Sequence, residues 1–162
     1  MKLLIIGNAR HGKDTLAEIF SKHFNVNFES SSHAACRLAI YPVLKEKYNY
    51  SSMEECFLDR VNHRKEWYDM ICDYNRNDPS RLTKDILSTS DIYVGLRSKR
   101  ELDGSRNLFD LIIFVDASSR LPLEGDDSCT ISRNDADIII ENNLGIEEFE
   151  KKSLSLGKLI FK

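Results

Sequence analysis

A glycine-bounded loop near the start of the chain constrains its fold more than any other feature. A short apolar run leads into Gly7, and Gly12 and Lys13 follow after four intervening residues. This is the spacing of a phosphate-binding loop, although Asp14 stands where serine or threonine is usual, with Thr15 behind it. The glycines let backbone amides turn toward an anion at the positive end of the following helix. A plain glycine turn is the alternative, but the lysine and the flanking patterns favour a phosphate site.

The composition is that of a globular protein with one domain. The 162 residues are 41% hydrophobic and 30% charged, which suffices for a single core. The net charge of -3 predicts no direct binding to nucleic acid or to an anionic membrane. No apolar run approaches the roughly 20 residues that span a bilayer, and nothing resembles a signal peptide. We expect reduced thiols and a cytoplasmic location, because the four cysteines are scattered: Cys36, Cys56, Cys72 and Cys129.

Apolar periodicity predicts strands that alternate with helices. Strands are expected at about 2–6, 26–29, 92–96, 111–115 and 138–140. Helices are expected at about 13–24, 34–45, 60–74 and 78–87, and after Gly145. Pro42 should kink the second of these or end it early. Capping boxes at 52–55 and 98–101 indicate the starts of two more helices. The last residues, 154–162, form either a strand or a docked tail. The order predicts an α/β protein, which together with the loop at 7–15 resembles the three-layer P-loop NTPase fold. Its doubly wound parallel sheet would have about five strands, with helices on both faces.

Several candidate residues fall on the edge of this sheet where parallel strands end and ligands bind. Asp14 would hold Mg²⁺, directly or through water, or would only stabilise the helix N-terminus. Thr15 could supply the missing hydroxyl. Asp116 is a second metal candidate, or else it caps the turn that follows its strand. If the strand at 92–95 neighbours the first strand, its terminal glycine leaves no metal-supporting aspartate there, which favours the role of Asp14.

Arginines are candidates because phosphoryl transfer spreads negative charge that positioned cations stabilise. Arg97 lies just past a strand, at the functional edge, and Arg10 lies inside the loop. Arg60 and Arg64 are four residues apart on one predicted helix, where ion pairs with nearby acids are the alternative. Arg100 follows Arg97. Arg120 and Arg133 flank a polar stretch that could fold over a nucleotide. Trp67 and Tyr68 would stack on a base or belong to the core, and His11 would lie beside the phosphates without acid or base chemistry.

The order of motifs resembles a known family. The segments are Gly-x-x-x-x-Gly-Lys-Asp-Thr at 7–15, Asn-His-Arg-x-x-Trp at 62–67, Tyr-Val-Gly-x-Arg-x-x-x-Glu at 93–101, Phe-Val-Asp-Ala-Ser-x-Arg at 114–120 and Asp-Ala-Asp-Ile-Ile-Ile-Glu-Asn-Asn at 135–143. Together they resemble the deoxynucleoside monophosphate kinases encoded by tailed bacteriophages, within the P-loop nucleoside monophosphate kinase superfamily. The loop indicates only the superfamily, and the second and third segments make the resemblance narrower.

The resemblance implies transfer of the ATP γ-phosphate to a deoxynucleoside monophosphate, with Mg²⁺, for DNA precursor supply in the cytoplasm of a phage host. It implies catalytic roles for Lys13, Arg97 and Asp14, and metal contacts from Asp14, Thr15 and Asp116. The ATP phosphates would be bound by Gly7, Asn8, Ala9, Arg10, His11, Gly12, Lys13, Asp14, Thr15 and Arg120. The acceptor would be bound by Arg60, Arg64, Trp67, Arg97 and Arg100.

The resemblance also implies a domain organisation. One kinase domain would cover 1–162, with a helical acceptor-binding insertion at about 33–90 and a lid-like loop at about 118–133. The stretch 121–132 is too short for a lid domain and holds no arginine, so closure would be by a loop, with Arg120 and Arg133 as lid-side cations. The helix at 60–74 could also serve as a homodimer face. The sequence does not reveal the base preference.

Two other functions stay open. One is a different P-loop small-molecule kinase, of the dephospho-CoA or phosphomevalonate type, whose acceptors lack a base or present it differently. The other is a nucleotide-binding regulator without turnover, suggested by the substituted loop position and by the missing strand-end aspartate.

Overall fold

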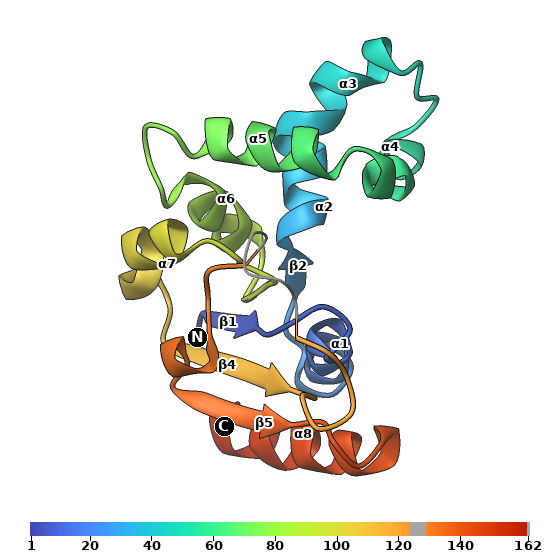
Figure 1. The fold of residues 1–162 in the computed structure, drawn as a ribbon. Helices are drawn as coiled ribbons and strands as arrows, with labels where there is room; N and C mark the ends of the chain where they lie inside the picture. Colours follow the sequence, from blue (N-terminus) through green and yellow to red (C-terminus); the bar gives the residue numbers. More distant parts are fainter. Residues whose placement is uncertain (124–128, 162) are drawn as a thin grey trace.

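Five parallel strands in the order β2-β3-β1-β4-β5 form the centre of the computed structural model, which describes residues 1–123 and 129–161 (Figure 1). The strands are β1 (Leu3–Ile6), β2 (Phe28–Ser30), β3 (Ile92–Val94), β4 (Leu111–Asp116) and β5 (Ile138–Glu141). Each pairs in parallel with its neighbours. The predicted α/β class and doubly wound parallel sheet are therefore confirmed, and β1 lies between β3 and β4.

Helices cover both faces of the sheet. They are α1 (Lys13–Phe24), α2 (Ser31–Ala35), α3 (Tyr41–Lys47), α4 (Met53–Asp59), α5 (Arg64–Tyr74), α6 (Arg81–Thr89), α7 (Lys99–Ser105) and α8 (Ile146–Ile160). Helices α2 to α5 project away from β5 and α8 (Figure 1). Nowhere in 1–123 or 129–161 does a helix combine the length and the apolar character that a membrane span needs.

Alternate residues of each strand enter different cores, which is why the strand sequences are almost continuously apolar. Leu3 and Ile5 of β1 pack with residues of α1 and α8. Leu4 and Ile6 pack on the opposite face, with residues of α2, α6 and the helices that project beyond them. All four side chains are fully buried. The two cores hold β1 in place, and the predicted phosphate-binding loop follows at its carboxyl end.

The helix predicted at 60–74 is wrong as a single element. Residues Arg60–Asn62 form a 3₁₀ turn, η2, and α5 begins only at Arg64. The carboxylate of Asp59 accepts hydrogen bonds from Asn62 Nδ2 at 2.6 Å and His63 Nε2 at 3.0 Å. Such side-chain bonds compete with helical backbone bonds and tighten the turn. Arg60 and Arg64 therefore do not share one helix face.

The helix predicted at 34–45 is longer than expected. Ser30 caps it by accepting a hydrogen bond from His33 N, so that α2 begins at Ser31. A π-helical turn, η1 (Cys36–Ile40), joins α2 to α3, and the chain stays helical through Pro42. Proline lacks the N–H that would bond to the carbonyl four residues back, and its ring crowds that carbonyl. Here the π-turn comes just before Pro42, which lies in the first turn of α3, so Pro42 neither ends nor interrupts the run.

Two other boundaries moved. Asp78 does not cap a helix directly; its Oδ1 accepts from Ser80 N at 2.9 Å and Ser80 Oγ at 2.6 Å, which delays the start of α6. Residues 154–160 form neither a strand nor a separate tail. They continue α8, after which the ring of Phe161 packs edge-on against Phe20, with 5.3 Å between the ring centroids.

Candidate functional site

The phosphate-binding loop requires glycine at both of its ends. Gly7 has φ 144°, and a Cβ added there would lie 2.5 Å from the carbonyl oxygen of Val115 at the end of β4. Gly12 has φ 104°, and a Cβ there would lie 2.6 Å from Asn142 Nδ2. A side chain would clash at each position and would strain the backbone. The loop therefore passes tightly over the carboxyl ends of β4 and β5.

Lys13 begins α1 and folds back across the loop. It is 8% exposed, and its Nζ donates a hydrogen bond of 2.7 Å to the carbonyl of Asn8. Gly12, the N-cap residue, brings no side-chain acceptor, so the first amides of α1 point to the place where a phosphate would lie. Asp14 is exposed in this first turn and Thr15 is half-buried. The first turn of α1 thus carries backbone amides, one ammonium group and two oxygen-bearing side chains.

The His11 side chain anchors the loop and does not face the phosphate position. The ring is fully buried, with Nδ1 accepting from Ala117 N at 3.0 Å and Nε2 lying 3.2 Å from the carbonyl of Pro122. Only a neutral ring with its proton on Nε2 satisfies both contacts. The backbone carbonyl of His11 accepts from Asn142 Nδ2 at 2.9 Å. Of His11, only the backbone is placed to contribute to a phosphate site.

Asn142 is a loop anchor that the sequence reading did not single out. Its side chain holds the loop, its backbone N–H donates to Asp116 O at 2.7 Å, and its carbonyl accepts from Arg120 Nε at 2.6 Å. The available signal was a polar residue directly after an apolar strand, within the segment at 135–143. Arg120 thus lies at the loop, on the β4–β5 side.

Asp116 caps the turn after β4, which was the alternative to a metal role. Its Oδ1 accepts from Ser118 N at 2.9 Å, and Oδ2 lies 3.4 Å from a guanidinium nitrogen of Arg133. Burial tends to raise the pKa of Asp116, but the Ser118 hydrogen bonds and the charge of Arg133 outweigh it, so the pKa lies below its ordinary value. Both oxygens are engaged, which leaves Asp14 and Thr15 as the better metal candidates. Within the described ranges no cluster of three or more metal-ligating residues occurs.

Gly95 occupies the strand end next to the phosphate-binding loop. Strand β3 pairs with β1, and Gly95 N donates to Ile5 O at 2.9 Å. The carbonyl of Gly95 accepts from Ser31 Oγ at 3.0 Å. From the sequence we expected no metal-supporting aspartate at this strand end if the strand at 92–95 neighboured the first strand. The two strands are neighbours, and the strand beside β1 ends without a carboxylate. Asp14 therefore stays the predicted source of negative charge near a bound cation.

A cavity of about 380 Å³, the β3 pocket, opens at the carboxyl end of β3. This volume lies in the usual range of small-molecule sites. Apolar and aromatic side chains form much of its wall, polar groups lie among them, and two arginines belong to the lining. The lining residues used below are Tyr68, Ile71, Asn75, Pro79, Leu82, Tyr93, Arg97, Arg100, Glu101 and Thr130.

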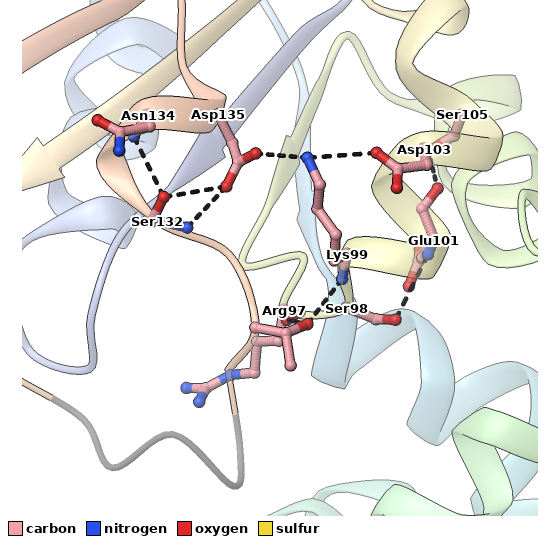
Figure 2. A network of polar contacts seen from close by, with 10 residues as sticks. Arg97, Ser98, Lys99, Glu101, Asp103, Ser105, Ser132, Asn134 and Asp135 are labelled. Atoms are coloured by element: carbon pink, nitrogen blue, oxygen red, sulfur yellow. Dashed lines mark hydrogen bonds and ion pairs between the residues drawn. The ribbon is translucent and has the colours of Figure 1, made fainter.

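Two of the predicted acceptor-binding residues, Arg97 and Arg100, line this pocket. The backbone at Arg97 is tied to the stretch before β5, since Thr130 N donates to Arg97 O at 2.9 Å and Lys99 N donates to Thr130 Oγ1 at 2.8 Å. Figure 2 shows the guanidinium group of Arg97 pointing away from Lys99. Arg100 donates to the carbonyl of Arg76 at 3.1 Å and so holds the loop between α5 and α6. Residues 124–128 of the predicted lid-like loop lie outside the described residues.

The other three predicted acceptor-binding residues lie elsewhere. The Arg60 guanidinium stacks over the Phe57 ring, 3.9 Å from its centroid, and lines a separate open hollow that Asp14 also lines. Arg64 is exposed on α5 and lines a different surface hollow. Trp67 is 5% exposed within the core and edge-on to Phe57, and its Nε1 has no hydrogen-bond partner among residues 1–123 and 129–161. The core alternative weighed for Trp67 is what the structure has.

Glu101 is a buried carboxyl group that the sequence indicated as a capping residue and as the last residue of the segment at 93–101. Ser98 Oγ does accept from Glu101 N, at 3.4 Å (Figure 2). The Glu101 side chain, however, is buried. Its Oε1 accepts from Tyr93 Oη at 2.9 Å and from Thr83 Oγ1 at 3.0 Å. Burial raises the pKa of Glu101 to about 7, although both hydrogen bonds act to lower it. A carboxyl group that titrates near neutrality therefore borders the β3 pocket.

The fold is similar to those of several kinases of known structure. Dephospho-CoA kinase from Campylobacter jejuni has a TM-score of 0.56 at 15% identity, covering 99% of this chain and 98% of that one. Shikimate kinase from Aquifex aeolicus gives 0.53 at 17% identity over all of both chains, and a gluconokinase from Sinorhizobium meliloti gives 0.53 at 10% identity over 99% and 93%. No protein-family model and no curated protein matches the sequence. At these identities the likeness confirms the predicted α/β fold alone.

Proposed function

We propose that this chain is an ATP-dependent kinase that transfers the γ-phosphoryl group of ATP to a deoxynucleoside monophosphate. The observation that carries the proposal is the pairing of two sites on one edge of the sheet. A phosphate-binding loop with a buried Lys13 follows β1, and a pocket with apolar walls and two arginines follows the adjacent strand β3. Ligands that react with one another must meet at such an edge.

The loop would hold the ATP phosphates. Its backbone amides and the start of α1 suit the phosphate oxygens, and the Lys13 ammonium group would leave Asn8 O to reach the transferring group. Magnesium takes oxygen ligands and retains several waters, so the exposed Asp14 carboxylate and the Thr15 hydroxyl fit it, directly or through water. Bound with ATP, Mg²⁺ would neutralise charge on the β- and γ-phosphate oxygens. Arg120, held at the loop by Asn142 O, would lie on the same donor side.

The β3 pocket suits a nucleotide acceptor. Tyr68, Ile71 and Leu82 offer a flat base an apolar and aromatic surface, whereas a polyhydroxylated acid would need polar groups on every side. Arg97 and Arg100 supply positive charge for the acceptor phosphate, close to the strand ends where transfer would occur. Arg97 is our candidate for the cation that stabilises the transferring group.

Two observations favour other functions. The likeness to dephospho-CoA kinase suits an acceptor of that kind, which would use the same edge of the sheet. The glycine at the end of β3 and the aspartate at position 14 suit a nucleotide-binding protein with little turnover. Both are addressed by testing acceptors and ATP binding in parallel.

The decisive experiment is an assay of ADP release with ATP and Mg²⁺ against a panel of deoxynucleoside and nucleoside monophosphates, with dephospho-CoA included. We expect release that depends on one or a few deoxynucleotides. Lys13→Ala should lower kcat roughly 100-fold or more, because it removes a positioned cation from the transferring phosphoryl group. Lys22→Ala, which alters an exposed lysine in the last turn of the same helix, should leave kcat unchanged.

Full activity in the Lys13→Ala protein would overturn the assignment of the loop as the catalytic site. Release with dephospho-CoA alone would move the function to that class of kinase. ATP binding without turnover of any acceptor would indicate a nucleotide-binding regulator.

A further inference from the structure

Two buried polar side chains of the β3 pocket are hydrogen-bonded through only one of their two terminal atoms, as far as residues 1–123 and 129–161 show. Glu101 and Asn75 are each 94% buried, with 6% of their surface exposed, and both line the pocket. Consecutive residues of α6 fix them. Thr83 Oγ1 donates to Glu101 Oε1 at 3.0 Å, and Leu82 N donates to Asn75 Oδ1 at 3.0 Å. Both side chains are therefore anchored by α6.

The other end of each side chain has no hydrogen-bond partner in the described part of the chain. No hydrogen bond from the described residues reaches Glu101 Oε2 or Asn75 Nδ2. Neither atom is enclosed, since Trp67 Nε1 is the one fully buried side-chain polar atom in 1–123 and 129–161 that lacks a partner. The amide orientation of Asn75 follows from chemistry, because only its oxygen can accept from the Leu82 N–H. When Glu101 is ionised, the pocket thus presents one acceptor, Oε2, and one donor, Nδ2.

Water can reach these two atoms in the open pocket, but a ligand that fills the pocket displaces that water. A polar group that the ligand then leaves unpaired costs about 1–3 kcal/mol, and more when it is charged. A ligand therefore binds well here only if it satisfies both atoms. The combination of a fixed acceptor, a fixed donor and flat apolar surroundings suits the polar edge of a heterocyclic base.

We propose that Glu101 and Asn75 read the base of the acceptor nucleotide, with Glu101 Oε2 accepting a hydrogen bond from the base and Asn75 Nδ2 donating one to it. The proposal rests on the proposed function and adds specificity-determining residues to it. Guanine and adenine present inverted edges, since guanine has a ring N–H beside a carbonyl and adenine has a ring nitrogen beside an amino group. Thymine and cytosine differ in the same way. A fixed acceptor–donor pair therefore favours one purine over the other and one pyrimidine over the other. With the disfavoured base, the hydrogen-bonding groups of the base and of the protein do not match.

The test exchanges the two functions without changing shape or net charge. Glu101→Gln replaces Oε2 by a donor and keeps an oxygen for Tyr93 and Thr83. Asn75→Asp replaces Nδ2 by an acceptor and keeps an oxygen for Leu82 N. Binding and kcat/KM are measured for dGMP, dAMP, dTMP and dCMP at about pH 8, where a carboxyl group of pKa about 7 is ionised.

We expect the double variant to reverse the preference of the wild type within the purine couple, the pyrimidine couple or both, by roughly tenfold or more. Glu101→Gln alone should weaken binding of the preferred base and should narrow the preference, which keeps the test decisive if the double variant does not fold. Tyr93→Phe removes one donor from Oε1 and leaves Oε2 in place, so it should lower stability without changing the preference.

The outcomes separate the two proposals. If the wild type binds and phosphorylates deoxynucleotides, and the double variant ranks them in the same order, the base-reading pair is overturned and the kinase stands. If the wild type binds none of the four, the proposed function is overturned and the base-reading pair is overturned with it. A change in ATP affinity equal to the change in acceptor affinity would also overturn the pair, because it would indicate general damage to the fold.

Discussion

Glu101 shows how one buried residue connects the stability of the fold with the chemistry of the pocket. The ordinary pKa of a glutamate is 4.5, and burial raises that of Glu101 to about 7. Between these values the folded protein holds a proton that the unfolded chain has released. The stability linked to this proton is fully present below about pH 4.5, and it is lost as the pH rises through about 7.

The free energy of unfolding should therefore fall by roughly 3 kcal/mol between pH 5 and pH 8 through Glu101. Urea unfolding of the wild type and of Glu101→Gln at both pH values measures the difference, and the glutamine variant should lose most of the dependence of the unfolding free energy on pH.

Other titratable groups act in a different range or belong to the pocket itself. Asp116 and Asp135 have lowered pKa values, so their contributions to stability change only below this pH window. The other titratable or charged groups that line the pocket are Tyr68, Cys72, Tyr93, Arg97, Arg100 and Cys129. Equal slopes in the two proteins would contradict the prediction.

Single residues also differ in how far the sequence could predict their place. Lys13 and both loop glycines could be placed from spacing alone, because the motif and the turn that it forms are local. Asn75 could not, since its position depends on where α6 begins and on which strand lies beneath it. The same holds for the inward turn of Glu101, which depends on contacts with Thr83 and Tyr93, 18 and 8 residues away along the chain.

Among the elements, α8 packs on α1 through a contact that only glycine permits. A Cβ at Gly157 would overlap the ring of Phe24, which itself stacks on Phe161 with 5.2 Å between the centroids. Gly157→Ala would gain about 1 kcal/mol from helix propensity, but overpacking typically costs about 1–3 kcal/mol. We expect a net loss of stability, measured as a lower urea midpoint. Ser155→Ala, on the exposed side of the same helix, should change stability by about 0.5 kcal/mol or less. A Gly157→Ala protein as stable as this control would contradict the packing argument.

The order of elements could be predicted from the sequence, but several of their ends could not. Apolar periodicity reports which face of an element is buried, so β1, α1 and β4 were expected nearly where they are. Ends depend on side chains that bond to the backbone or to each other. Asp59 tightens the turn before α5 and Asp78 delays α6, and periodicity contains no trace of either contact. Because of these local bonds, Arg60 and Arg64 lie in different elements. The arginines that line the β3 pocket are Arg97 and Arg100.

For the molecule as a whole, the fold could be predicted because each strand and helix has its own local pattern of apolar residues. The pocket could not be predicted, because residues far apart in the sequence form it. Its walls come from α5, α6, β3 and α7 together with residues 129 and 130. The strand order that brings β3 beside β1 decides where this pocket lies relative to the loop. Strand patterns alone do not fix that order. The predicted sheet was therefore confirmed, while the acceptor-binding roles stay predictions for Arg97 and Arg100.

The two sites on one sheet edge predict additive stabilisation by two ligands. A non-hydrolysable ATP analogue with Mg²⁺ at about 100 times its Kd adds about 2.7 kcal/mol, which for a chain of this size raises Tm by roughly 5–10 °C. Removing the metal with a chelator, or replacing Lys13 by alanine, should reduce this shift. The preferred deoxynucleotide should add a second shift in the presence of the analogue, because the loop and the β3 pocket have different linings. Calorimetric melting with each ligand alone and with both measures the sum. If the deoxynucleotide instead cancels part of the analogue's shift, the two compete for the phosphate-binding loop, and the β3 pocket is not the acceptor site.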